Sequence, residues 1–226
     1  MKLATPLTKK RIRDHFTYNF WKYLLSAALC IFLWNMIYIQ TEYRPPENKR
    51  IDVYVQTAQV TADEIDAFLK PVWNDAVPDM ELVRSVVLMM PGGADYMSNM
   101  QLVTYLTAGE GDLYMLNAAD FKRFAAQEAF LPLEQMVESG EIDATGIDTR
   151  SGWVTSQQTH EEDDKTVYTT EQHLYGIPAH NLKRFEKELG MRTDDLYIAV
   201  SVSNGNEDNV IAFLSYLIQW AQKTEN

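Results

Sequence analysis

The chain has 226 residues, a single cysteine and a net charge of −12, from 20 basic and 32 acidic side chains. Six of the basic residues and one acidic residue fall within 1–22, so the remainder carries 14 basic and 31 acidic side chains, a charge of −17. Such an acidic region argues against a nucleic-acid partner and against binding to an anionic lipid surface. Because Cys30 is the only cysteine, no disulfide can form within the chain, and a hydrophobic core must stabilise the fold.

Residues 20–40 are predicted to form a transmembrane helix in contact with membrane lipid. Seventeen consecutive residues, Tyr23 to Ile39, carry no charge, and about 20 helical residues span a hydrocarbon core. Aromatic side chains flank both ends, as in the interfacial belts of spanning helices. The basic residues of 1–22 predict a cytoplasmic segment before the helix and an extracellular domain after it, in a single-pass protein of the cell membrane.

Two alternatives to this uncleaved signal anchor stay open. A cleaved signal peptide would need a small-residue cleavage site, and no A-x-A-like site follows the apolar run. A lipoprotein would use Cys30, but Leu29 precedes it where a small residue is expected. Both features favour the uncleaved anchor.

A short tether, 41–50, with two prolines leads into the predicted extracellular domain, 51–226. Short apolar or alternating runs predict strands at 51–56, 80–90, 112–116 and 196–202. Apolar residues at helical spacing predict helices at 61–73, 95–107, 117–127, 182–189 and 210–223. The first of these helices can be capped by Thr61 or Asp63, and Met100 and Val103 of the second are expected in the core. Alternating strands and helices indicate an α/β fold, and the nearly continuous apolar run at 80–90 suits a sheet covered on both faces.

Residues 139–172 lack a sustained hydrophobic period and are rich in acidic, Ser and Thr residues. We expect a long polar loop here, which could fold as a small lid if 167–170 paired with 153–155. The acidic run at 160–164 is not spaced as a calcium loop and indicates a solvated face rather than a metal site.

Three stretches resemble the extracellular solute-binding proteins that feed bacterial ABC importers. They are LVTYLTAGEGDLYMLNAADFKRFAAQEAFLPLEQ at 102–135, YGIP at 175–178 and DLYIAVSVSNGNEDNVIAFLSYLIQW at 195–220. The resemblance implies a periplasmic-binding-protein-like α/β fold, an open sheet with helices on both faces. It covers the first lobe, and the space between Met136 and Tyr175 is too short for a full second lobe, so we expect that lobe to be largely absent.

The same resemblance implies ligand contacts on the loops that follow the strands. The matching positions are Gln56, Asp95, Asn117 and Asp120, with Trp153 and Tyr175 as aromatic platforms. Two alternatives stand beside these assignments. Asn117 and Asp120 could serve only to cap a helix, and Trp153 could belong to a small satellite core.

No local catalytic, phosphate-binding or metal motif is present, so we expect neither an enzyme nor a bound cofactor. The expected function is a membrane-anchored, extracytoplasmic ligand cleft associated with an ABC-type importer. Its partners would be a small solute, sugar or peptide, and a permease or another membrane protein. The alternative is an interaction or regulatory subunit of a membrane complex that keeps the fold without a ligand.

Overall fold

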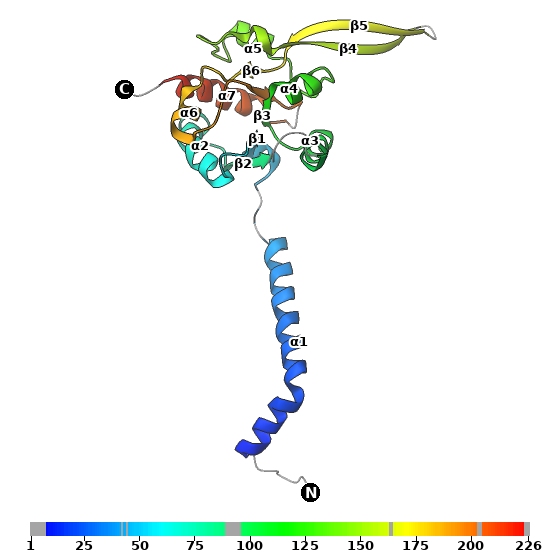
Figure 1. Cartoon of the computed structure of the whole chain (residues 1–226), viewed down its shortest axis with the longest axis vertical. Coiled ribbons are helices and arrows are strands. Elements are labelled where there is room, and N and C mark those ends of the chain that lie inside the picture. Colours follow the sequence, from blue (N-terminus) through cyan, green and yellow to red (C-terminus); the bar gives the residue numbers. More distant parts are fainter. Residues whose placement is uncertain are drawn as a thin grey trace. The chain divides into compact units, whose positions relative to one another are not determined.

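The computed structural model of the chain describes residues 8–41, 43, 45–88, 96–162, 165–202 and 205–223 (Figure 1). Asp95 and the 89–94 part of the second predicted strand and its loop lie outside these ranges. The chain divides into two compact units, Met1–Arg44 and Pro45–Asn226, and each is described by itself.

The first unit is built on one long helix, α1 (Lys9–Thr41), of 33 residues. At 1.5 Å per residue its length is about 50 Å. An 18-residue window within Arg13–Ile39 has a mean hydropathy of 1.5 and is not buried, so by length and composition the helix could cross a membrane. Its phenylalanine, leucine, isoleucine and tryptophan side chains are exposed, which is the state expected of a surface that lipid would cover.

The second unit contains a five-stranded mixed sheet in the order β2-β1-β3-β7-β6. Its strands are β1 (Arg50–Gln56), β2 (Leu82–Leu88), β3 (Leu113–Asn117), β6 (Ile177–Pro178) and β7 (Leu196–Val200). The first three strands are parallel to one another, whereas β7 is antiparallel to both β3 and β6. Each of the four strands predicted from the sequence is present.

Helices cover both faces of this sheet. On one face, α2 (Ala62–Ala76), α5 (Glu134–Ser139), α6 (Lys183–Leu189) and α7 (Glu207–Gln222) pack over Ile51, Val53 and Val55 of β1. On the other, α3 (Tyr96–Ala108) and α4 (Ala118–Ala125) pack over Tyr54 of β1 and the side chains of β3 that share its face. Successive side chains of a strand point to opposite faces, so β1 contributes to both cores. The predicted α/β class is confirmed.

Two details of the helices differ from or extend the prediction. Met100 and Val103 of α3 are 49% and 42% exposed, so their predicted burial is wrong, and Leu102 faces the core instead. The helix is rotated about its axis relative to the prediction. The sequence has apolar residues on two neighbouring faces of α3, and the face with Leu102, not the face with Met100 and Val103, packs on the core. The cap of α2 is Thr61, whose backbone and side chain share a capping box with Glu64.

The polar segment expected as a long loop, or as a small lid if 167–170 paired with 153–155, contains a hairpin in a different register. After a 3-10 turn, η2 (Thr149–Gly152), it forms β4 (Trp153–Glu162) and β5 (Lys165–Leu174), an antiparallel pair of ten residues each. Val167 pairs with His160 and not with the predicted 153–155. The pattern was hidden because the hairpin is polar on both faces, so no alternation of apolar and polar residues marks it.

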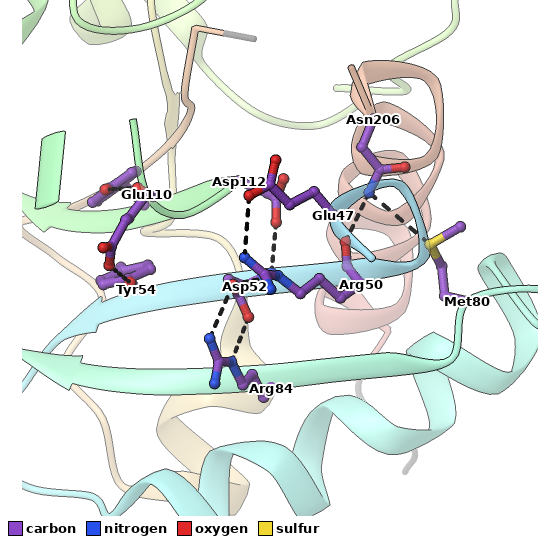
Figure 2. Close-up of polar contacts among 10 residues, drawn as sticks. Glu47, Arg50, Asp52, Tyr54, Met80, Arg84, Glu110, Asp112 and Asn206 are labelled. Carbon is purple, nitrogen blue, oxygen red and sulfur yellow. Dashed lines mark hydrogen bonds and ion pairs between the residues drawn. The ribbon is translucent and has the colours of Figure 1, made fainter. Parts of the chain in front are cut away.

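Asp52, in the middle of the sheet, carries a carboxylate that is only 3% exposed (Figure 2). Two cations neutralise it: Nε of Arg84 lies 2.5 Å and Nε of Arg50 lies 3.1 Å from its oxygens. Arg84 comes from β2, so this ion pair links the two strands. The Asp52 backbone N–H donates to the Asp112 carboxylate at 2.6 Å, and Asp112 N–H donates back to the Asp52 carbonyl, which ties β1 to the start of β3.

Asp52→Ala is expected to lower the free energy of unfolding of the Pro45–Asn226 unit by about 3 kcal/mol, because two guanidinium groups lose their buried partner. Urea unfolding measures this change. Asp79→Ala, at an exposed turn position, is the matched control and should change stability by less than about 0.5 kcal/mol. Equal effects of the two substitutions would contradict the role given to Asp52.

Candidate functional site

The order β2-β1-β3 creates a topological switch point between the carboxyl ends of β1 and β3. The chain leaves β1 toward α2 on one face of the sheet and leaves β3 toward α4 on the opposite face. In open α/β sheets, ligands bind at the point where two such connections diverge. The last residues of the two strands are Gln56 and Asn117, both of which the sequence had singled out.

Gln56, Asn117 and Asp120 are brought together at this switch point in one hydrogen-bonded cluster. The Gln56 side-chain oxygen accepts from the Asn117 backbone N–H at 3.0 Å and from Asn117 Nδ2 at 2.8 Å. Gln56 Nε2 donates to Asp120 Oδ2 at 2.7 Å, and Asn117 Nδ2 donates to the same oxygen at 3.1 Å. All three residues are half-buried, so solvent still reaches the cluster.

Asn117 also caps α4, so the helix-capping alternative describes one of its roles. Its side-chain oxygen accepts from the Asp120 backbone N–H at 2.9 Å, and its own backbone is extended. Asp120 lies in the first turn, where its negative charge is stabilised by the helix dipole. Capping and the contact with Gln56 use different atoms of Asn117, and the two roles are therefore compatible.

Arg123 completes the cluster, and the sequence reasoning did not identify it. Its Nη2 lies 3.1 Å from Asp120 Oδ1 and donates to Asn99 Oδ1 of α3 at 2.6 Å, while its guanidinium lies 4.3 Å from the ring centre of Phe124. It faces a shallow groove of about 330 Å³ between α3 and α4, lined also by Val103 and Leu106. The available signal was the spacing of three residues after Asp120, which places the two side chains on one helix face.

The two aromatic candidates do not join this cluster. Tyr175 is 2% exposed, and its hydroxyl lies 3.3 Å from the Ser156 hydroxyl. Burial raises the pKa of the Tyr175 phenol. The ring packs in the core between the sheet and α4, which corrects its prediction as a stacking platform. Trp153 is 37% exposed at the first position of β4, where it pairs with Leu174.

Asp95, the remaining candidate, lies outside the described residues. Within the described part of the chain, no group of three or more His, Cys, Asp or Glu side chains could hold a metal ion. The cluster of Gln56, Asn117, Asp120 and Arg123 offers amide, carboxylate and guanidinium groups, which donate and accept hydrogen bonds.

Asn117→Ala is expected to lower the free energy of unfolding by about 1 kcal/mol through loss of the α4 cap. Asn117→Ser keeps a capping oxygen but loses the amide that bonds Gln56 and Asp120. The serine variant should therefore recover most of the stability, as measured by urea unfolding. If serine were as destabilising as alanine, the contact with Gln56, and not the cap, would be the stabilising interaction.

No protein-family model matches the chain, and no curated protein matches it. Among solved structures it is similar to an extracellular solute-binding protein family 1 from Alicyclobacillus acidocaldarius subsp. acidocaldarius DSM 446, with 17% identity and a TM-score of 0.38 over 61% of this chain and 29% of that one. It is also similar to an ABC substrate-binding protein from Listeria monocytogenes in complex with cycloalternan, with 18% identity and a TM-score of 0.35 over 56% of this chain and 28% of that one. The chain covers less than a third of the length of either protein.

Proposed function

We propose that the chain is a membrane-anchored, extracytoplasmic domain that binds a small polar solute at the crevice between β1 and β3. The observation that carries the proposal is the position of the Gln56–Asn117–Asp120 cluster. Three polar side chains from two strands and a helix meet at the switch point of the sheet, where open α/β folds bind ligands.

The charge of the cluster favours a neutral solute. Asp120 is the one carboxylate in the cluster, and Arg123 balances its charge at 3.1 Å. Amide groups from Gln56 and Asn117 supply both donors and acceptors, which suit the hydroxyl groups of a sugar or the backbone groups of a peptide. A bound solute would exchange its own hydrogen bonds for part of the internal network.

Anchoring by α1 would keep this domain at the outer face of the membrane, at high effective concentration for a membrane partner. An importer permease is the partner that we propose, since delivery of a captured solute needs a protein that crosses the bilayer. Residues 1–22 would be cytoplasmic, because their six cations obey the positive-inside rule.

The alternative function, an interaction or regulatory subunit without a ligand, is favoured by one specific observation. The side chains of Gln56, Asn117 and Asp120 already bond to one another, so the crevice is satisfied without a solute. In that case the cluster would only stabilise the fold, and the Pro45–Asn226 unit would bind a partner protein through its surface.

Ligand binding is tested by thermal unfolding of the full chain in lipid nanodiscs against a panel of sugars, short peptides and amino acids. A solute at 100 times its dissociation constant should stabilise the domain by about 2.7 kcal/mol. Gln56→Ala should abolish the stabilisation, whereas Gln135→Ala, an exposed position on α5, should retain it. No stabilisation by any compound, together with co-purification of a membrane protein, would favour the ligand-less alternative.

Orientation is tested separately with single cysteines in a Cys30→Ala background. Ser139 and Thr8 are both exposed and lie after and before α1 respectively. We expect a membrane-impermeant maleimide to label Ser139→Cys on intact cells, and to label Thr8→Cys only after the membrane is permeabilised. The reverse pattern would refute the extracellular placement, and labelling of both positions would refute the anchor.

A further inference from the structure

The base of the β4–β5 hairpin is joined to α5 through His173. Its Nδ1 lies 2.6 Å from Glu134 Oε1 at the start of α5, and its Nε2 lies 3.3 Å from Glu171 Oε2 on the same strand. The second oxygen of Glu134 accepts from the Leu174 backbone N–H at 3.2 Å. One imidazole therefore lies between two carboxylates, and one of them also holds the backbone of β5.

Beyond this base, β4 and β5 extend away from the sheet and helices of the Pro45–Asn226 unit (Figure 1). An isolated two-stranded ribbon is at best marginally stable in water, so its direction depends on the contacts at its base. Leu174 is buried in the core, and the Tyr175 hydroxyl lies 3.3 Å from the buried Ser156 hydroxyl of β4. The Leu133 N–H bonds to the Leu174 carbonyl at 2.7 Å, and together with the His173 contacts this bond joins the end of β5 to the start of α5.

The charged and titratable groups around His173 are nearly all acidic. Glu134 faces it from α5 and Glu171 from β5, and the Tyr175 ring lies edge-on at 5.7 Å between ring centres. Glu128, just after α4, adds a third carboxylate near Tyr175, where its charge helps to raise the pKa of the phenol. The residue of β4 that pairs with His173 is Val154, which carries no charge.

We propose that His173 is a protonation latch, which seats the β4–β5 hairpin firmly on α5 when the imidazole is charged and loosens it when the imidazole is neutral. A charged imidazole donates one hydrogen bond from each ring nitrogen and can hold Glu134 and Glu171 together. A neutral imidazole has a single N–H, so one of the two contacts loses its donor. The proposal is independent of the solute crevice, because none of its residues belongs to the Gln56 cluster.

The surroundings of His173 favour the charged imidazole and raise its pKa. The hydrogen bond to Glu134 is the largest cause that raises the pKa of His173, and the one to Glu171 adds to it, against a smaller effect of burial. A histidine whose pKa is raised in the folded state contributes stability that is complete below its ordinary pKa. That contribution is lost as the pH rises through the raised value, so the hairpin is seated in acid and released toward alkaline pH.

Hydrogen–deuterium exchange of the full chain in nanodiscs, corrected for the intrinsic effect of pH, tests the latch. Between pH 5.5 and pH 8.5, amides of 153–156 and 171–175 should lose protection by about fivefold, as expected for one charge-assisted hydrogen bond at a partly exposed site. Amides of β1 and β3 report on the sheet and should keep their protection. Equal loss in the sheet and in the hairpin would overturn the proposal, because it would indicate a global loss of stability.

Three substitutions separate the latch from a merely structural histidine. His173→Lys keeps a positive charge at both pH values and should hold the hairpin protected at both. His173→Gln stays neutral and should leave it loose at both, whereas His180→Gln, at an exposed histidine, should keep the wild-type pH dependence. A pH dependence that survives in His173→Gln would overturn the proposal.

Discussion

The burial of β1 on both faces is the constraint on which the rest of the structure depends. Five of its seven residues are buried, and it lies between β2 and β3 in the middle of the parallel part of the sheet. No polar group along such a strand can rely on water, so each must find a partner inside the protein. Asp52 shows how strict this requirement is. Its carboxylate is held by two arginines, and its backbone N–H by Asp112.

The same requirement shapes the carboxyl end of β1, where the candidate site lies. Gln56 leaves the buried strand with an amide that must be satisfied, and Asn117 and Asp120 provide the partners. These three residues thus form a structural cluster that solvent also reaches. Any solute that binds there must compete with existing hydrogen bonds, which favours a ligand whose groups reproduce their geometry. Arg123 extends the cluster to α3 through Asn99, so both helices of this face are connected to it.

The hairpin follows a different physical rule. Its strands satisfy their backbone groups by pairing with each other over ten residues, and Leu174 at its base lies in the core. The His173 contacts join this base to α5, so a local charge acts on the hairpin without touching the residues of β1 and β3. The chain combines a sheet covered by helices on both faces with a β4–β5 hairpin that we expect to have lower local stability.

The sequence predicted well those features that depend on local pattern and chain order. The strands at 51–56 and 112–116, the Thr61 cap and the α/β class follow from hydrophobic period and capping chemistry, which act over a few residues. Gln56, Asn117 and Asp120 could be named because loops at the carboxyl ends of parallel strands gather at one edge of a sheet. The apolar length of 20–40 likewise depends on composition alone.

Only the tertiary structure decided which partners these residues have. The pairing of β4 with β5, the burial of Tyr175, the rotation of α3 and the His173 contact with Glu134 all join residues that no local period connects. Hydrophobic pattern specifies which face of an element is apolar, but not which distant group will meet it. A polar hairpin or a buried tyrosine is settled by hydrogen bonds and packing between residues that no local hydrophobic period relates, and these exist only once the chain has folded.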